Sequence, residues 1–214
     1  MSINTSNKIS HLKKEELLPL VCAAAALRED EKLKKLILEC LTKGIKQIEL
    51  YESLLQNYLF TGYPSAMISL KILSEYTSPD INTSLNEGWD LNKYRARGTK
   101  NCKKIYGQKF DKLISNVEMF SPELSDWLML EGYGKVMGRK GLSLKKRELN
   151  NVAVLTVLKF DEQLYSHING AFRTGSSIDE ISSVILNLDL FEIKGLKEFG
   201  MKTIKKYIKK KGTG

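Results

Sequence analysis

The chain has 214 residues, enough to bury a core as one large domain or as two small ones. Hydrophobic residues make up 42% and charged residues 28%, a balance that excludes a disordered or fibrous chain. No segment approaches the roughly 20 consecutive apolar residues of a membrane span, so we expect no membrane partner.

The net charge of +9 is concentrated at one end of the chain. Residues 194–214 contain eight lysines and a single acidic residue, Glu198, so this segment carries +7 and the rest of the chain only +2. Proteins that bind nucleic acid usually spread basic residues over a groove and mix them with aromatic residues. We therefore predict a solvated basic helix and tail at 194–214, and no nucleic-acid partner. Contact with acidic partners is the alternative.

Cysteine and histidine residues show no pattern of a disulfide scaffold or a metal site. Cys22, Cys40 and Cys102 are odd in number, far apart and never in a CxxC pair. His11 and His167 have no neighbouring cluster of ligand residues. This usage predicts reduced thiols, a cytoplasmic location and no metal.

One apolar run, residues 17–27, superficially resembles a secretory signal because Lys13 and Lys14 precede it. Glu15 and Glu16 interrupt that basic flank, and the run has a counterpart deep in the chain. We therefore interpret it as a helix of the folded protein.

The chain repeats itself without gaps at an offset of 131 residues, with 13 identical pairs over the 47 positions from 14 to 60. The identical pairs include Leu18/Leu149, Asp30/Asp161, Gly44/Gly175, Glu49/Glu180 and Phe60/Phe191. A duplicated unit explains such self-similarity most simply.

The sequence of each copy predicts three helices, and no segment of similar length shows the alternation of apolar and polar residues that is typical of a strand. The first helix covers 17–27 or 147–158, and the second covers 31–42 or 162–174. The second ends at Gly44 or Gly175, where a residue without Cβ can adopt the left-handed conformation. The third helix of the second copy begins at Ser177, whose spacing to Glu180 is that of a capping box. The fold class is therefore all-α.

The segment between the two copies, residues 77–100, is polar and rich in turn residues, and we interpret it as a linker. A helix over 103–117 and another starting at Ser121-Pro122 are predicted to follow. Residues 131–142 contain four glycines and predict a loop. The expected organisation is an N-terminal repeat over 1–76, the linker, a C-terminal repeat over 101–193 and the basic segment 194–214.

Several strings in the second half carry a family resemblance. They are Ser121-Pro122-Glu123-Leu124, the loop from Tyr133-Gly134 to Arg139 and Gly141-Leu142, Lys146-Arg147-Glu148-Leu149, and Leu164-Tyr165-Ser166-His167-Ile168-Asn169-Gly170-Ala171. With them, residues 102–188 resemble the carboxymuconolactone decarboxylase family. The first half is similar to the same family through Gln56-Asn57-Tyr58 and Thr61-Gly62-Tyr63-Pro64. The resemblance implies two alkylhydroperoxidase D-like helical repeats, with helical hairpins packed together, in a homo-oligomer that is a trimer of two-repeat chains.

The same resemblance implies His167 and Glu148 as the catalytic residues. A histidine that titrates near neutrality suits proton transfer to or from carbon, and a carboxylate can orient it. By position, Arg139, Lys135 and Arg147 are the candidate cations for a carboxylate substrate, with Tyr133 beside them. Lys135 and Lys140 depart from the family pattern, which has an acidic residue and a proline at these places.

Each candidate also has a purely structural interpretation. A lone histidine on an amphipathic helix is often a packing residue, and Glu148 could act as a first-turn acid that favours the helix dipole. Arg139 and Arg147 could form ion pairs, while Tyr133 and Trp127 could be core aromatics. The repeat offers a contrast, because the first copy has Leu17 in place of Glu148 and Leu36 in place of His167.

The sequence thus predicts a cofactor-free enzyme that decarboxylates or isomerises a carboxylate-bearing lactone or keto acid by acid–base chemistry. One alternative is an alkylhydroperoxidase-type antioxidant protein. It is disfavoured because the two cysteine positions of that relative's CxxC motif are occupied by Phe160 and Gln163. A non-catalytic oligomeric binding protein of the same fold is the other alternative.

Overall fold

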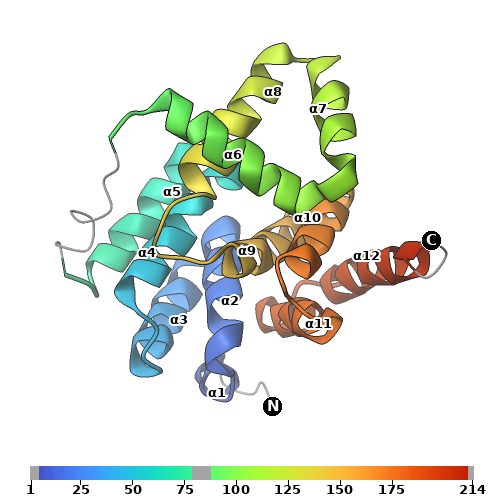
Figure 1. Cartoon of the computed structure of the whole chain (residues 1–214). Helices are drawn as coiled ribbons and strands as arrows, with labels where there is room; N and C mark the ends of the chain where they lie inside the picture. Colours follow the sequence, from blue (N-terminus) through green and yellow to red (C-terminus); the bar gives the residue numbers. More distant parts are fainter. Residues whose placement is uncertain (1–4, 79–87, 212–214) are drawn as a thin grey trace.

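The computed structural model describes residues 5–78 and 88–211, and within these ranges every regular element is a helix (Figure 1). The first half contains α1 (Thr5–Ser10), α2 (Lys14–Leu27), α3 (Asp30–Thr42), α4 (Gln47–Gln56) and α5 (Tyr58–Ser74). The middle contains α6 (Leu91–Tyr106), the short 3-10 helix η2 (Gly107–Lys109), α7 (Phe110–Glu118), α8 (Pro122–Trp127) and the π-helix η3 (Leu128–Val136). The last part contains α9 (Leu144–Val157), α10 (Asp161–Arg173), α11 (Ile178–Asn187), η4 (Leu188–Phe191) and α12 (Leu196–Lys211). The predicted all-α class is confirmed.

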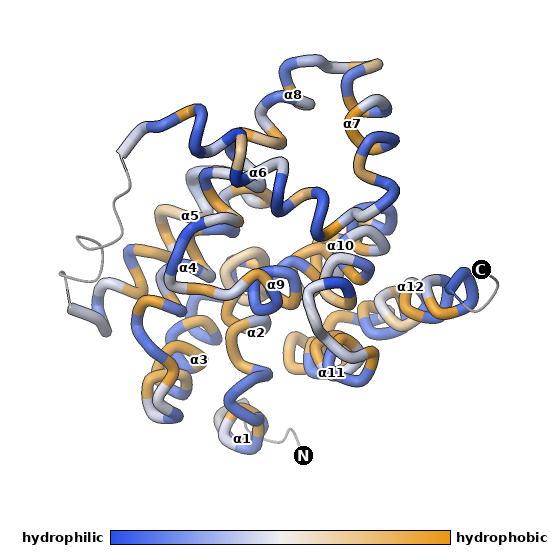
Figure 2. Tube along the Cα trace, viewed as in Figure 1, coloured by the Kyte–Doolittle hydropathy of each residue, from blue (hydrophilic) through white to orange (hydrophobic). Residues whose placement is uncertain are grey.

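The two central helices are α2 and α9, which pack against each other. Every residue from Leu17 to Ala25 in α2 is buried, and so is every residue from Arg147 to Val157 in α9. A helix that is apolar all round must be covered by neighbours on every side. Figure 2 shows α2 as a largely hydrophobic tube with other helices around it. The apolar run 17–27 is therefore a core helix, and no helix among the described residues has the length and apolarity needed to cross a membrane.

The helix boundaries are consistent with the repeat. When α3 and α4 are shifted by 131 residues, their bounds coincide with those of α10 and α11. Gly44 and Gly175 follow the second helix of each copy with φ of 68° and 103°, the left-handed conformation predicted for them. The predicted capping box is also present, because the Ser177 side chain accepts from the Glu180 backbone while Glu180 accepts from the Ser177 backbone.

The last ten residues of the predicted linker, 91–100, belong to the helix α6. The Asp90 side chain accepts a hydrogen bond from the Lys93 backbone and caps a helix that starts at Leu91. The predicted helix over 103–117 is divided near Gly107, where φ is 58°, into the end of α6, η2 and α7. The linker residues 79–87 lie outside the described ranges.

The glycine-rich segment predicted as a loop is helical as far as Val136, so that prediction was also wrong. Glycines on both helices let η3 and α6 cross closely, because a Cβ on Gly98 of α6 would collide with the backbone of Met129, and one on Gly134 of η3 with the backbone of Tyr94. Glycine is here a packing residue, and the gain from close packing offsets its low helix propensity.

The basic C-terminal segment forms the expected helix, α12, but one face of it is buried. Ile204 and Tyr207 pack into the core, and α12 contacts α10 and α11. Asp161 of α10 accepts a hydrogen bond from Thr203 and pairs with Lys206 at 3.2 Å. The prediction of a fully solvated helix was therefore wrong for this face. The tail residues 212–214 lie outside the described ranges.

Candidate active site

A pocket of about 370 Å³ opens among α5, α7, α8, η3, α9 and α10. Its lining is mostly apolar, and the residues are Leu59, Phe60, Val117, Phe120, Leu124, Trp127, Leu128, Glu131, Gly132, Tyr133, Met137, Asn151 and His167. The described lining holds one carboxylate, Glu131, and no lysine or arginine. Such a cavity suits a small and largely apolar molecule.

His167 and Glu148 meet at the inner wall of this pocket. His167 Nδ1 lies 2.7 Å from Glu148 Oε2, a distance typical of a charge-assisted hydrogen bond. Glu148 is fully buried, whereas His167 remains 8% exposed and lines the pocket. No described residue bonds to Nε2, so with Nδ1 donating to the carboxylate, Nε2 is the ring nitrogen left for chemistry.

Gly170, which follows His167 by three residues on α10, makes this contact possible. A Cβ at Gly170 would lie 2.5 Å from Glu148 Oε2 and 2.9 Å from Ile105 Cγ2. The residue at the equivalent repeat position is Glu39. The second copy therefore differs from the first at three positions. Two of them supply the carboxylate and the imidazole, and the third, a glycine, leaves room for the contact between them.

Two amides that the sequence analysis missed extend the pair. Gln56 of α4 donates to Asn151 Oδ1 at 2.7 Å, and the Asn151 amide nitrogen lies 3.3 Å from His167 Nδ1 as a packing contact, since Nδ1 already donates to Glu148. Asn151 lies three residues after Glu148, on the same side of α9. Its repeat counterpart is Leu20, so the contrast that singles out Glu148 could also have identified Asn151.

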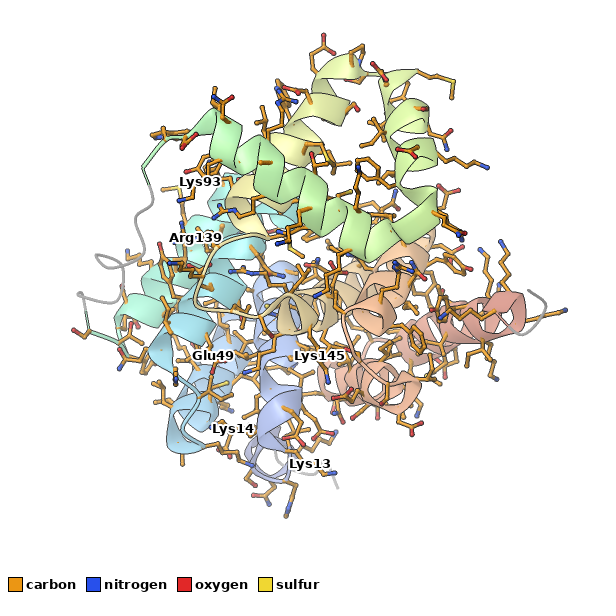
Figure 3. The ribbon with its side chains drawn as sticks, viewed as in Figure 1. Lys13, Lys14, Glu49, Lys93, Arg139 and Lys145 are labelled. Atoms are coloured by element: carbon orange, nitrogen blue, oxygen red, sulfur yellow. The ribbon has the colours of Figure 1, made fainter. Side chains whose placement is uncertain are left out.

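Arg139 and Arg147, predicted to hold the substrate, do not line the pocket. Arg147 is fully buried and pairs with Glu52 of α4 at 2.7 Å. Arg139 pairs with the same carboxylate at 2.9 Å. Figure 3 shows Arg139 on the segment that crosses in front of α4 between η3 and α9. Because a buried carboxylate needs charged partners, the pairing with Glu52 holds both guanidinium groups beside α4.

Lys135 and Tyr133, the other predicted substrate contacts, lie differently. Lys135 does not line the pocket; it lies 3.5 Å from Glu131, which does, and its ammonium is over the Trp89 ring. Tyr133 lines the pocket and shares a hydrogen bond of 2.8 Å with the Tyr106 hydroxyl. Burial raises the pKa of both tyrosines, so both hydroxyls stay protonated at neutral pH.

The outer wall of the pocket consists of aromatic and aliphatic side chains from α7 and α8. Trp127, one of the expected core aromatics, is 56% exposed, and Phe120 is 73% exposed. The prediction of a core position for Trp127 was therefore wrong. Sequence reasoning missed this wall because α7 and α8 lie outside the repeat and bring their apolar residues to the site only through the tertiary fold.

The three thiols are buried, and none is placed for thiolate chemistry. Burial raises the pKa of Cys40 to about 12, and burial together with the Glu148 charge raises that of Cys102 to about 12. Over residues 5–78 and 88–211, no group of three His, Cys, Asp or Glu side chains is arranged to hold a metal ion.

The comparisons with known proteins give a distant similarity. No family model matches the chain. Over 88 residues the chain is 27% identical to a protein of Acinetobacter baylyi named 4-carboxymuconolactone decarboxylase. The aligned segment covers 41% of this chain and 66% of that protein, so it spans slightly less than two thirds of the relative's length. The chain is therefore similar, in part of its length, to a decarboxylase.

Proposed function

We propose that this protein is a small-molecule enzyme that decarboxylates or isomerises a carboxylate-bearing lactone or keto acid by proton transfer at carbon. One observation carries the proposal: His167, whose Nδ1 lies 2.7 Å from Glu148 Oε2, lines an open and largely apolar pocket. A histidine held by a buried carboxylate is a well-suited acid–base group near neutral pH.

The chemistry follows from the orientation of the ring. With Glu148 accepting from Nδ1, protonated His167 carries its second proton on Nε2, toward the pocket. Cleavage of the bond to the carboxylate leaves carbon dioxide and an enolate, whose carbon takes the Nε2 proton. Solvent then returns a proton to Nε2 and the cycle is complete. In an isomerisation, His167 instead removes a proton from one carbon and returns it to another.

The lining limits the substrate. The cations expected to hold a carboxylate, Arg139 and Arg147, are bound to Glu52, so among the described lining residues His167 is the basic side chain. Asn151 and Tyr133 are neutral polar side chains that line the same pocket, and the Tyr133 hydroxyl shares its hydrogen bond with Tyr106. We therefore favour a compact substrate with one carboxylate next to a carbonyl or enol group.

The two alternatives are less well supported. An alkylhydroperoxidase mechanism needs a low-pKa thiol with a resolving partner, but Phe160 and Gln163 occupy those positions and all three thiols are buried. A non-catalytic binding protein would be favoured if side chains filled the space beside His167. The open volume of about 370 Å³ there weighs against that alternative.

The direct test is a turnover assay of the wild type, His167→Ala and His11→Ala on lactone and β-keto acid substrates. His11 is exposed and does not line the pocket, so it is the matched control for losing a histidine. We expect His167→Ala to lower turnover by at least about 100-fold with the fold intact by circular dichroism, and His11→Ala to match the wild type. Equal turnover in all three proteins would overturn the proposal.

A further inference from the structure

The pocket that His167 lines also has an acidic residue in its wall, Glu131 of η3. Among the described lining residues it is the one carboxylate, and none of them is a lysine or an arginine. Glu131 takes no part in the acid–base pair, because the described contacts of its carboxylate are with Tyr58 and Lys135 and not with His167 or Glu148. In a mostly apolar pocket a few polar groups orient the ligand and give specificity. Glu131 is therefore a candidate for such a role.

Two side chains hold this carboxylate through the same oxygen. The Tyr58 hydroxyl donates to Glu131 Oε1 at 2.6 Å, and the Lys135 ammonium lies 3.5 Å from that atom. Burial and the hydrogen bond to Glu131 raise the pKa of Tyr58, so its hydroxyl stays protonated at neutral pH and remains the donor. No described residue donates a hydrogen bond to the second oxygen, Oε2, so this oxygen can accept one from a ligand.

The position of Lys135 favours a neutral ligand group over a cation. Its ammonium lies 3.5 Å from Glu131 Oε1 and 4.7 Å from the centroid of the Trp89 ring. A ligand ammonium on Oε2 would share one carboxylate with Lys135 and would be repelled by it. A hydroxyl group donates a hydrogen bond without adding charge. A hydroxyl is therefore the group that suits this carboxylate best.

We propose that Glu131 determines substrate specificity by binding a hydroxyl group of the substrate and by excluding substrates that carry a second carboxylate. A hydrogen bond to an ionised acceptor is stronger than one between neutral groups. A second carboxylate would instead lie beside a like charge, and the described lining has no lysine or arginine to offset it. The inference rests on the proposed function, because it takes this pocket as the substrate site, and it narrows the substrate to a hydroxylated monocarboxylate.

Isothermal titration calorimetry of the full chain tests the inference without turnover. The three probes are phenylacetate, 4-hydroxyphenylacetate and 4-carboxyphenylacetate, which differ only in the group at the far end of the ring. We expect the wild type to bind 4-hydroxyphenylacetate at least about tenfold tighter than phenylacetate, because a hydroxyl reaches Glu131. It should bind 4-carboxyphenylacetate at least about tenfold more weakly than phenylacetate, because like charges then meet.

The decisive variant is Glu131→Gln, which keeps the size of the side chain and removes its charge. It should lose most of the preference for 4-hydroxyphenylacetate and bind 4-carboxyphenylacetate at least about tenfold tighter than the wild type does, a gain that a damaged pocket would not give. The matched control is Glu118→Gln on α7. Glu118 is an exposed carboxylate next to Val117 that does not line the pocket, so all three affinities should stay within about twofold of the wild type.

Four outcomes would overturn the inference. They are the same ligand preferences in Glu131→Gln as in the wild type, equal changes in Glu131→Gln and Glu118→Gln, no binding of any probe, and tighter binding of 4-(aminomethyl)phenylacetate than of 4-hydroxyphenylacetate. The last would make a cation the preferred group. The expected preferences in a wild type that turns over no lactone or keto acid would support the inference on the pocket and contradict only the proposed function.

Discussion

At the scale of single residues, the candidate site has a cost in stability. Glu148 is fully buried, and its Oε1 atom has no hydrogen-bond partner among the described residues. A buried carboxylate oxygen without a partner costs on the order of 1–3 kcal/mol. The repeat counterparts of Glu148 and His167, Leu17 and Leu36, are fully buried apolar residues at no such cost. A polar pair kept against this cost is the pattern expected of a functional site.

Replacing the pair with the leucines of the first copy, Glu148→Leu/His167→Leu, should therefore stabilise the protein. We expect the free energy of unfolding in urea to rise by about 1–3 kcal/mol, as happens when a buried polar pair is replaced by well-packed apolar residues. The matched control is Glu52→Leu, which removes the partner of the buried Arg147 and should cost about 3–5 kcal/mol. A double variant less stable than the wild type would contradict this account.

At the scale of helices, glycines allow neighbouring helices to approach closely at particular positions. Gly170 and Gly200 each lie where a Cβ would be 2.5 Å from a neighbour, but the neighbours differ. At Gly170 the neighbour is the Glu148 carboxylate, and at Gly200 it is a methyl group of Ile185. The first glycine therefore gives the Glu148 carboxylate its place beside His167, and the second serves the packing of α12 on α11 and α9.

Gly170→Ala should accordingly displace Glu148 from His167 and lower turnover by at least about tenfold. Gly200→Ala is its matched control, because it crowds the core to a similar degree and should lower stability by about 1–3 kcal/mol without lowering turnover per folded molecule. Steady-state kinetics and urea unfolding on the same preparations separate the two effects. A similar loss of turnover in both variants would show that Gly170 has no particular role at the site.

Most helices could be predicted from local sequence, since apolar spacing, caps and C-terminal glycines are local signals. The pairing of Glu148 with His167 could be anticipated because both lie on consecutive helices and both are leucine in the first copy. The contacts of Glu52 with Arg139 and Arg147 join residues about 90 positions apart, and no local pattern predicts them. The helix in the glycine-rich segment was missed for a related reason, because Gly134 allows a close approach to Tyr94 of α6, a contact between distant residues, and does not mark a turn.

At the scale of the whole molecule, apolar side chains remain on the surface around the pocket. Met119, Phe120 and Trp127 are all more than half exposed, next to the mouth of the site. A patch of this kind often marks a contact with another chain.

The trimer of two-repeat chains inferred from the family resemblance stays a prediction. Light scattering at micromolar concentration should give three times the 24.3 kDa mass of the chain, and a monodisperse monomer would count against it.

The central claim is that His167 delivers a proton to the carbon of a small substrate while Glu148 orients the ring. The most direct measurement is turnover in D₂O, with mass spectrometry of the product from the wild type and from His167→Gln. We predict that the wild type places one deuterium on the carbon that lost carbon dioxide, and that His167→Gln yields at least about 100-fold less product. Deuterated product formed at the wild-type rate by His167→Gln would contradict the account.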